Sequence, residues 1–249
     1  MSGHSKWATI KHKKSALDAK RGALFTKLIK EITVAARNGG GNPEMNPRLR
    51  VAIAKAKEAN MPGDNIDRAV KKGTGELPGV SYEEITYEGY GQAGIAILID
   101  ALTDNKNRTT AEIRNIFEKK GGNMSGAGSV AWQFQKKGLL IVLRSAVDED
   151  KLMGIALDAG ASDFKTEENT YEIVTEPPDF ENVKKAIADA GIPAESAEVT
   201  KIASNMVKVS AGEAKSILGL IEAFEEHEDV QNVYSNADIP DEVVQELTK

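Results

Sequence analysis

The residues most able to do chemistry in this chain are cations, and they are concentrated toward its N-terminus. Residues 1–75 contain 16 Lys and Arg against 6 Asp and Glu, whereas residues 76–249 contain 16 against 32. Such segregation, in a chain whose net charge is only −6, is typical of a basic module that binds a polyanion and is carried on an acidic body. The acidic body repels phosphate, so the basic end would approach nucleic acid first. The alternative is that these cations only solubilise a small helical domain.

Within the basic segment, cations recur at a spacing that suits a phosphate backbone. Lys13, Lys20 and Lys27 are seven residues apart, so on a helix they drift by only about 20° per step and form one stripe. Lys30 and Arg37 form a second stripe beside the first. A row of flexible cations releases counterions when it contacts phosphate, and the alternative is a solvated helix face. The stripes therefore predict contacts with a nucleic-acid backbone.

The segment before this helix adds an aromatic residue to the cations. Residues 3–14 contain four lysines, two histidines and Trp7, a mixture that suits a backbone contact plus a stacked base. Trp7 could instead anchor the segment to the helices. Arg48 and Arg50 are candidates for base readout in a helix-turn-helix arrangement, although backbone contact is the stronger prediction. The predicted nucleic-acid-binding residues are Lys6, Trp7, Lys11, His12, Lys13, Lys14, Lys20, Arg21, Lys27, Lys30, Arg48 and Arg50.

The other patterns that could do chemistry lack the context that the chemistry needs. Residues 89–94 match G-x-G-x-x-G, but a dinucleotide site needs a helix after the motif, and a strand pattern follows here. We therefore expect a hairpin turn and no cofactor. His4 and His12 stand among lysines, which disfavour a metal ion. We expect His227 and the acidic residues 222–229 to form a solvated surface at a helix end, which favours a cationic imidazole. These patterns predict no catalytic residue, no metal site and no enzyme.

Periodicity indicates the elements that position these residues. Three amphipathic helices are predicted in the basic segment: residues 15–37, a second from Asn46-Pro47 onward, and a third from Asp64 to near Gly73. Residues 73–79 are a predicted linker. Residues 139–202 follow the order βαββαβ of a ferredoxin-like unit. The segments on either side, strand 95–102, helix 109–119, strand 129–134 and then strand 206–209, helix 213–226, strand 230–234, together predict a second such unit.

We therefore expect an α+β fold with an N-terminal three-helix domain and two ferredoxin-like α/β units, one inserted in the other. The predicted domains are residues 1–75, residues 80–136 with 204–249, and the inserted residues 137–203. Three consecutive domains are the alternative. The chain has no Cys and no apolar run near the ~20 residues of a membrane span. Residues 1–30 lack the apolar core of a secretory signal. These features predict a cytoplasmic protein without membrane contact.

Several motifs carry a resemblance to a known family. Gly3-His4-Ser5-Lys6-Trp7, Asp18-Ala19-Lys20-Arg21-Gly22 and Gly41-Asn42-Pro43-Glu44-Met45-Asn46-Pro47-Arg48-Leu49-Arg50 resemble the signature of the YebC/PmpR family. Further matches are residues 59–62, 71–75, 102–105 and 128–132, so the resemblance covers the whole chain. Gln92-Ala93 departs from the Pro-Gly more usual in the family and alters only a hairpin turn.

The resemblance implies a cytoplasmic protein of one helical and two α/β domains, described as a probable transcriptional regulator that binds DNA, with no catalytic residues to transfer. Other members are implicated in translation, either on bacterial ribosomes or in the synthesis of a mitochondrial respiratory-chain subunit. We therefore expect a non-enzymatic regulator that binds nucleic acid through its basic N-terminal domain. A ribosome-associated factor that contacts ribosomal or transfer RNA, and a scaffold that docks another protein, are the alternatives.

Overall fold

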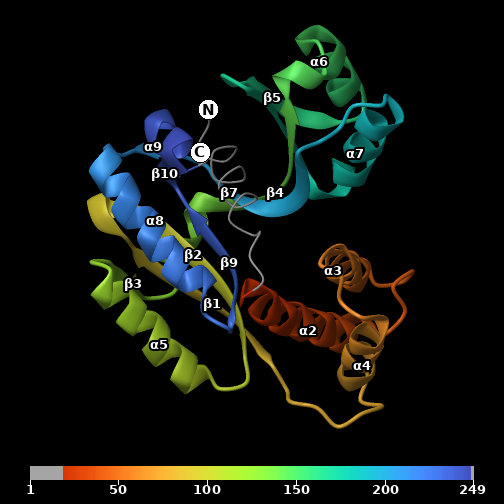
Figure 1. Cartoon of the computed structure of the whole chain (residues 1–249), viewed down its shortest axis with the longest axis vertical. Helices are drawn as coiled ribbons and strands as arrows, with labels where there is room; N and C mark the ends of the chain where they lie inside the picture. The colour runs from red at the N-terminus through yellow and green to blue at the C-terminus, as the bar shows by residue number, and fades with distance from the viewer. Residues whose placement is uncertain (1–18, 248–249) are drawn as a thin grey trace.

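The computed structural model describes residues 19–247, which form a group of helices and two α/β units (Figure 1). The first three described helices are α2 (Ala19–Gly39), α3 (Pro47–Glu58) and α4 (Gly63–Gly73). They confirm the three helices predicted from the periodicity. Their apolar faces bury a hydrophobic cluster that belongs to these helices alone and includes Ile32, Leu49, Ala52, Ala56 and Ile66.

The buried side chain of Asn46 fixes the turn between α2 and α3. Its Oδ1 accepts a hydrogen bond from the backbone N–H of Leu49 at 3.1 Å, which caps α3 because the first N–H groups of a helix have no partner within it. Its Nδ2 donates to the carbonyls of Ala35 and Gly40, each at 2.8 Å. Pro47 follows at the first helical position, as the sequence predicts.

The outer α/β unit is built on a four-stranded antiparallel sheet with the order β3-β1-β2-β9. Its elements are β1 (Glu83–Tyr90), β2 (Ala96–Thr103), α5 (Lys106–Lys119), β3 (Asn123–Ser125), α8 (Ala211–Glu225) and β9 (Val230–Ser235). Helices α5 and α8 cover one face of the sheet (Figure 1). Between them the rings of Phe117 and Phe224 meet edge to face, with centroids 4.6 Å apart. The predicted hairpin is confirmed, because β1 and β2 pair antiparallel on either side of the turn η1 (Gln92–Gly94).

The chain forms this sheet with a connectivity that the sequence does not predict. In a ferredoxin-like unit, two parallel strands joined by a helix are split by a third strand. Here β2 and β3 are the parallel strands, α5 joins them, and β1 lies between them. The strand between the two parallel strands is therefore β1, from the hairpin that precedes them. The ferredoxin-like prediction instead placed strand 206–209 in that position.

The strand predicted at residues 129–134 is wrong. These residues form a loop with the short helix η2 (Ala131–Gln133), because the buried carboxylate of Glu88 binds their backbone. It accepts hydrogen bonds from the N–H groups of Gly128, Val130 and Ala131 at 2.7, 2.7 and 2.8 Å. A strand could not present three N–H groups to one carboxylate. The loop leaves the side chain of Trp132 71% exposed.

The strand predicted at residues 206–209 is shorter than expected and does not join the main sheet. β8 (Val207–Lys208) pairs parallel with β10 (Ala237–Asp238) in a separate two-stranded sheet, and α9 (Asp241–Leu247) follows. The buried Asn236 holds this ribbon beside β2: its carbonyl accepts from the N–H of Val207 at 2.8 Å and its Oδ1 accepts from the N–H of Ala96 at 2.9 Å. The ribbon thus extends the edge of the outer unit.

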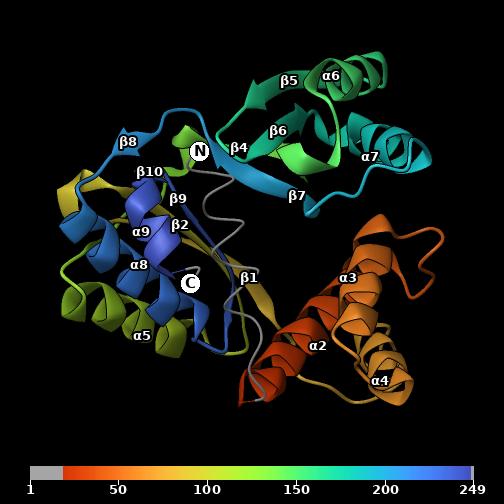
Figure 2. The same ribbon diagram turned by 45° about the horizontal axis from the view of Figure 1, so that its top comes forward.

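The segment between β3 and α8 forms the second sheet, with the order β5-β6-β4-β7 (Figure 2). Its elements are β4 (Phe134–Leu143), α6 (Glu149–Asp158), β5 (Ala161–Thr166), β6 (Thr170–Thr175), α7 (Phe180–Asp189) and β7 (Ser196–Ala203), with the short helices η3 (Arg144–Ala146) and η4 (Pro177–Asp179). This is the ferredoxin-like order, and the α+β fold class with one unit inserted in the other is confirmed. The domain boundaries stay a prediction. Across residues 19–247, no helix is long and apolar enough to span a bilayer.

Candidate nucleic-acid interface and the Asp229 network

The structure places only part of the predicted nucleic-acid-binding set. Lys6, Trp7, Lys11, His12, Lys13 and Lys14 lie outside the described residues. Lys20 and Arg21 belong to the first turn of α2. The remaining four predicted residues, Lys27, Lys30, Arg48 and Arg50, lie on α2 and α3, where their contacts can be followed.

On α2, Lys27 and Lys30 face the acidic body. The Nζ of Lys27 donates to the carbonyl of Glu225 at 2.5 Å. The Nζ of Lys30 donates to the carbonyl of Glu228 at 3.2 Å and to Oδ1 of Asp229 at 2.5 Å. Lys30 is therefore buried, with 7% of its surface exposed, and the prediction that it belongs to an exposed stripe is wrong. The last carbonyls of a helix have no intrahelical partner and carry partial negative charge, so the end of α8 attracts these two ammonium groups.

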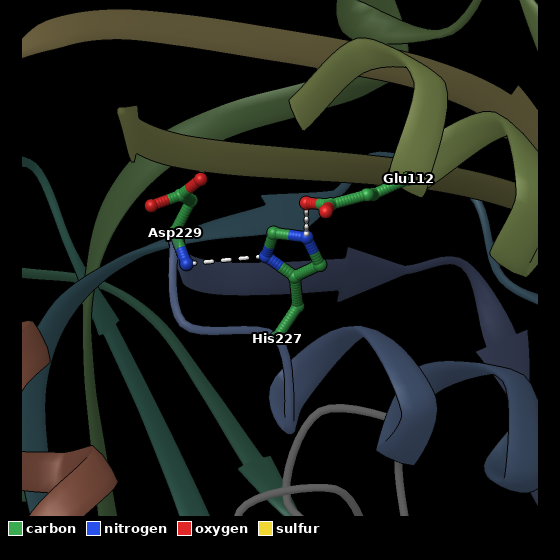
Figure 3. A group of neighbouring side chains, drawn as sticks. All are labelled: Glu112, His227 and Asp229. Atoms are coloured by element: carbon green, nitrogen blue, oxygen red, sulfur yellow. Dashed lines mark hydrogen bonds and ion pairs between the residues drawn. The ribbon is translucent and has the colours of Figure 1, made fainter. Parts of the chain in front are cut away.

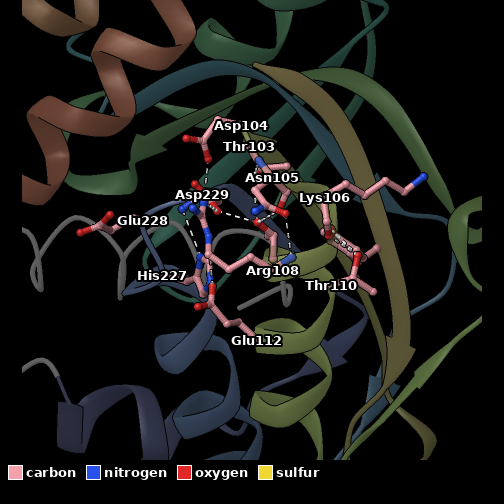
Figure 4. A network of polar contacts seen from close by, with 12 residues as sticks. Thr103, Asp104, Asn105, Lys106, Arg108, Thr110, Glu112, His227, Glu228 and Asp229 are labelled. Carbon is pink, nitrogen blue, oxygen red and sulfur yellow. Dashed lines mark hydrogen bonds and ion pairs between the residues drawn. The ribbon is translucent and has the colours of Figure 1, made fainter. Parts of the chain in front are cut away.

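Asp229 also binds Arg108 of α5 (Figure 4). Its Oδ2 accepts from the guanidinium of Arg108 at 2.8 Å and from the hydroxyl of Thr109 at 2.6 Å. Burial alone raises the pKa of the Asp229 carboxyl, but the hydrogen bonds from Lys30, Thr109 and Arg108 outweigh it and hold that pKa well below its usual range. The carboxylate is thus ionised, with both oxygens occupied. Sequence reasoning placed Asp229 on a solvated acidic face, which is wrong: its side chain is 2% exposed.

His227 lies beside this network but is not free on the surface (Figure 3). Its Nδ1 accepts from the backbone N–H of Asp229 at 3.1 Å, and its Nε2 lies 2.9 Å from Oε2 of Glu112. Both ring nitrogens are therefore engaged, one with the backbone of its own loop and the other with α5. The sequence predicts a solvated imidazole at a helix end, whereas the side chain is only 12% exposed because the loop folds its own N–H onto the ring.

Glu112, His227 and Asp229 bring three potential ligand atoms within 4.8 Å of one another. These residues do not fit a metal ion well. Both ring nitrogens of His227 and both carboxylate oxygens of Asp229 are already in hydrogen bonds. The ammonium of Lys30 and the guanidinium of Arg108 also lie directly on Asp229, and they would repel a cation. The group is a structural network.

Helix α3 carries its cations on two flanks. Arg48 and Lys55 are seven residues apart on one flank, and Arg50 and Lys57 are seven apart on the other, about 160° around the helix. Arg48 pairs with Glu31 of α2 at 2.7 Å and with Glu84 of β1 at 2.9 Å. The hydrogen bond that Arg48 donates to Glu31 in particular raises the pKa of Arg48 above its already high value. This flank faces the body, so Arg48 is not positioned for base readout.

The opposite flank is open to solvent. Arg50 and Lys57 are exposed, as are three cations of α4. Arg50 makes one long hydrogen bond, to the carbonyl of Pro43 at 3.4 Å. Within residues 19–247, none of these side chains forms an ion pair with an acid. We call this set the outer cationic surface; it comprises Arg50, Lys57, Arg68, Lys71 and Lys72.

Sequence reasoning named Arg50 but missed the other four cations of the outer cationic surface, and it missed the network around Asp229. The seven-residue spacing of Arg50 and Lys57 was available as a signal, equal to the spacing that marked Lys13, Lys20 and Lys27. Arg108 and Thr109 lie three and four residues after the matched family motif at residues 102–105. Their bonds to Asp229 join positions 121 and 120 residues apart, and local spacing does not reveal such contacts.

Comparison with known proteins agrees with this architecture. Residues 5–76 match the model of the TACO1/YebC protein N-terminal domain, and residues 82–237 match that of the TACO1/YebC second and third domain. A probable transcriptional regulatory protein of Desulfatibacillum aliphaticivorans is 58% identical over 99% of this chain and 100% of its own length. One from Dictyoglomus turgidum, bearing the same name, is 55% identical over the full length of both chains.

A solved structure shares the fold. The crystal structure of a conserved hypothetical protein from Aquifex aeolicus is 46% identical to this chain, has a TM-score of 0.78, and is matched over 90% of this chain and 92% of its own. Likeness at this level of identity and coverage extends to all three parts of the molecule: the helices, the outer sheet and the inserted sheet. Together with the two family models, it shows that the chain belongs to the TACO1/YebC family.

Proposed function

We propose that this protein is a transcriptional regulator that acts by binding nucleic acid through its helical domain, without catalysis. The observation that carries the proposal is the outer cationic surface, five exposed cations that the described acidic residues leave unpaired. The names of the relatives, probable transcriptional regulatory proteins, support the regulatory part of the proposal.

Arg50 and Lys57 are the residues of this surface best placed for a backbone contact. They lie two helical turns apart on one flank of α3, about 10 Å along the helix axis, which lets them reach different phosphates of one strand. The α4 cations have Asp64 and Asp67 on the same helix, which weakens the local field there. Among the residues predicted from the sequence, Lys6, Trp7, Lys11, His12, Lys13, Lys14, Lys20 and Arg21 remain proposed contacts toward the N-terminus. Lys27 also remains a proposed contact, on the side of α2 that faces the body.

Contacts of this kind bind the phosphate backbone and do not read sequence. Each cation that neutralises a phosphate releases condensed counterions, so affinity falls as salt rises. Phosphate contacts alone also do not distinguish DNA from RNA. The physiological target is therefore assigned by comparing duplex DNA with ribosomes in one assay.

The experiment measures affinity for a random DNA duplex and for ribosomes across a salt series. The test variant is Arg50→Glu with Lys57→Glu. The matched control is Lys119→Glu with Lys120→Glu, which makes the same change of charge on exposed residues of the body. The test variant should lower the log–log salt slope by about 1.8, for two lost phosphate contacts, and the control should keep the slope. Equal slopes for the test variant and the wild type would refute the proposed surface.

The two polyanions separate the regulator from the translation factor. Duplex binding with a steep salt slope supports the transcriptional regulator. Ribosome binding that persists at physiological salt, while duplex binding disappears, would instead assign the protein to translation.

A further inference from the structure

We infer that the contact between α2 and the loop after α8 is a reversible dock, in which residues 225–229 occupy cations that a nucleic-acid backbone would otherwise bind. Lys30 carries the inference, since its ammonium is held by Asp229 and by the carbonyl of Glu228. The inference rests on the proposed function and specifies how part of the nucleic-acid surface is covered and uncovered.

The helical domain and the body share no hydrophobic cluster. The hydrophobic cluster of α2, α3 and α4 contains no residue of the body, and the clusters of the body contain no residue of these helices. The contacts across the interface include hydrogen bonds and ion pairs, among them Lys30 with Asp229 and both Arg48 and Asn38 with Glu84. Separating the two parts therefore leaves these hydrophobic clusters intact; Val34, one turn of α2 after Lys30 and fully buried, belongs to none of them. Salt weakens the charged contacts that hold the two parts together.

Each side keeps a partner of its own when the dock opens. Asp229 retains Arg108 and Thr109, both in α5 of the body. On the other side, Arg48 retains Glu31, at 2.7 Å within the helical domain. A charge left buried and unpaired is the main penalty for breaking a buried ion pair. Here the carboxylate stays paired and the ammonium of Lys30 moves into water or onto a phosphate, so that penalty is avoided.

The connection between the two parts allows the movement. Residues 74–81 are exposed along their whole length, and Gly75 has a φ of 83°, a conformation that glycine adopts at no steric cost. At the end of this linker Arg37 donates to Ser81 Oγ at 2.7 Å and to the carbonyl of Tyr82. These are exposed bonds that water can replace.

The ligand that opens the dock is a polyphosphate backbone. Asp229 and the carbonyls at the end of α8 form an anionic surface that complements the cations of α2, and a phosphodiester strand offers the same complement. These groups of the body thus occupy the position that a phosphate would take, and nucleic acid must displace them to reach Lys30.

The first test measures the separation of the two parts in the full chain. Because the chain has no native Cys, Asp64→Cys on α4 and Glu118→Cys on α5, both exposed, can carry a pair of spin labels. Distances from double electron–electron resonance should form one narrow population at low salt. A longer, broader population should appear at high salt and on addition of a random DNA duplex. An unchanged narrow population under all conditions would overturn the inference.

The second test removes the negative charge of Asp229, which competes with nucleic acid for Lys30. Asp229→Asn takes away the charge that holds Lys30. Asp104→Asn is the control, because Asp104 also pairs with Arg108, at 2.9 Å, but does not touch α2. If the docked form is about 90% populated, Asp229→Asn should tighten duplex binding about tenfold. It should also steepen the salt slope by about 0.9 for each cation uncovered, whereas the control should change neither.

A further variant guards against a folding defect in Asp229→Asn. Glu84→Gln removes an exposed carboxylate that bridges Arg48 and Asn38 across the interface, without touching the buried network, and should shift binding in the same direction. If both variants bind the duplex with the wild-type affinity and slope, the dock is not a competitor and the inference fails while the proposed function stands. If neither the variants nor the wild type binds a duplex or ribosomes at low salt, the proposed function and the inference fail together.

Discussion

Replacing Glu88 by Gln isolates the role of one buried carboxylate in shaping the loop that presents Trp132. Glu88 is 5% exposed. One of its oxygens accepts from the N–H of Gly128, and the other accepts from those of Val130 and Ala131. Gln has the same shape, but one of its two positions is an NH₂ group that cannot accept. The substitution therefore removes at least one hydrogen bond without creating a cavity.

The magnitude follows from which N–H loses its partner. The substituted Gln side chain can keep its oxygen toward Val130, which is fully buried, and turn its NH₂ toward Gly128, which is exposed and can bond water. The substitution then removes one charge-assisted hydrogen bond, which contributes about 1.5–3 kcal/mol to stability. It also weakens the other two hydrogen bonds, because their acceptor is no longer charged. We expect the free energy of unfolding to fall by about 2 kcal/mol at pH 7.

The loss of unfolding free energy caused by Glu88→Gln should depend on pH. Burial raises the pKa of the Glu88 carboxyl, but the hydrogen bonds from the backbone outweigh it and leave that pKa below its ordinary value. A carboxyl whose pKa is lower in the folded state stabilises the fold above its unfolded pKa, about 4.3, and loses this contribution as the pH falls through its folded pKa. Protonated Glu then resembles Gln. The difference in stability between wild type and Glu88→Gln should therefore shrink below about pH 4.

Urea unfolding followed by circular dichroism at pH 7 and at pH 3.5 measures both quantities. In a Trp7→Phe background, Trp132 is the remaining tryptophan, so its fluorescence reports the loop directly. Glu118→Gln, at an exposed position of α5, makes the same chemical change as a control. A penalty for Glu88→Gln below about 0.5 kcal/mol at pH 7, the usual range of surface substitutions, or one that is equal at the two pH values, would refute the reasoning.

Three further predictions test the core, the helical domain and the interface between the sheets. Phe224→Ala should lower the free energy of unfolding by about 3–5 kcal/mol in urea, because this ring is fully buried against Phe117. Asn46→Ala should cost about 1–2 kcal/mol as a lost cap, and hydrogen exchange should show α3 losing protection while the sheets keep theirs. Burial, with the charges of Asp100 and Glu198, raises the pKa of Tyr234 far above its usual value of about 10. Alkaline titration by ultraviolet absorbance should therefore show at least one tyrosine that ionises only when the protein unfolds.

Features with a local cause were predictable from the sequence. Asn46-Pro47 marks the start of α3, because a cap and a fixed φ act within one turn of helix. The turn at residues 89–94 was recognised as a hairpin since a strand pattern flanks it on both sides. The ferredoxin-like order of the inserted unit followed from a regular alternation of strand and helix patterns.

Features with a distant cause were not predictable. Val130 and Phe134 fit a strand pattern, but Glu88, about forty positions earlier, binds the intervening backbone and prevents the strand. Lys30 fits an exposed stripe, but its partner Asp229 is 199 residues away. In both cases a buried carboxylate binds residues that are distant in sequence but close in the fold. Periodicity within one segment of the chain does not reveal such contacts.

The two flanks of α3 suggest an order for the binding event. Arg50 and Lys57 point away from the body and are accessible while the helical domain is docked, whereas Lys30 is accessible only after it leaves Asp229. A nucleic-acid strand would therefore meet the outer cationic surface first, and its charge would then compete for Lys30. Because the second step exchanges one anionic partner for another, its free energy is small and sensitive to salt. In the proposed function, charge segregation along the chain would thus provide both the ligand-binding surface and an internal competitor that limits it.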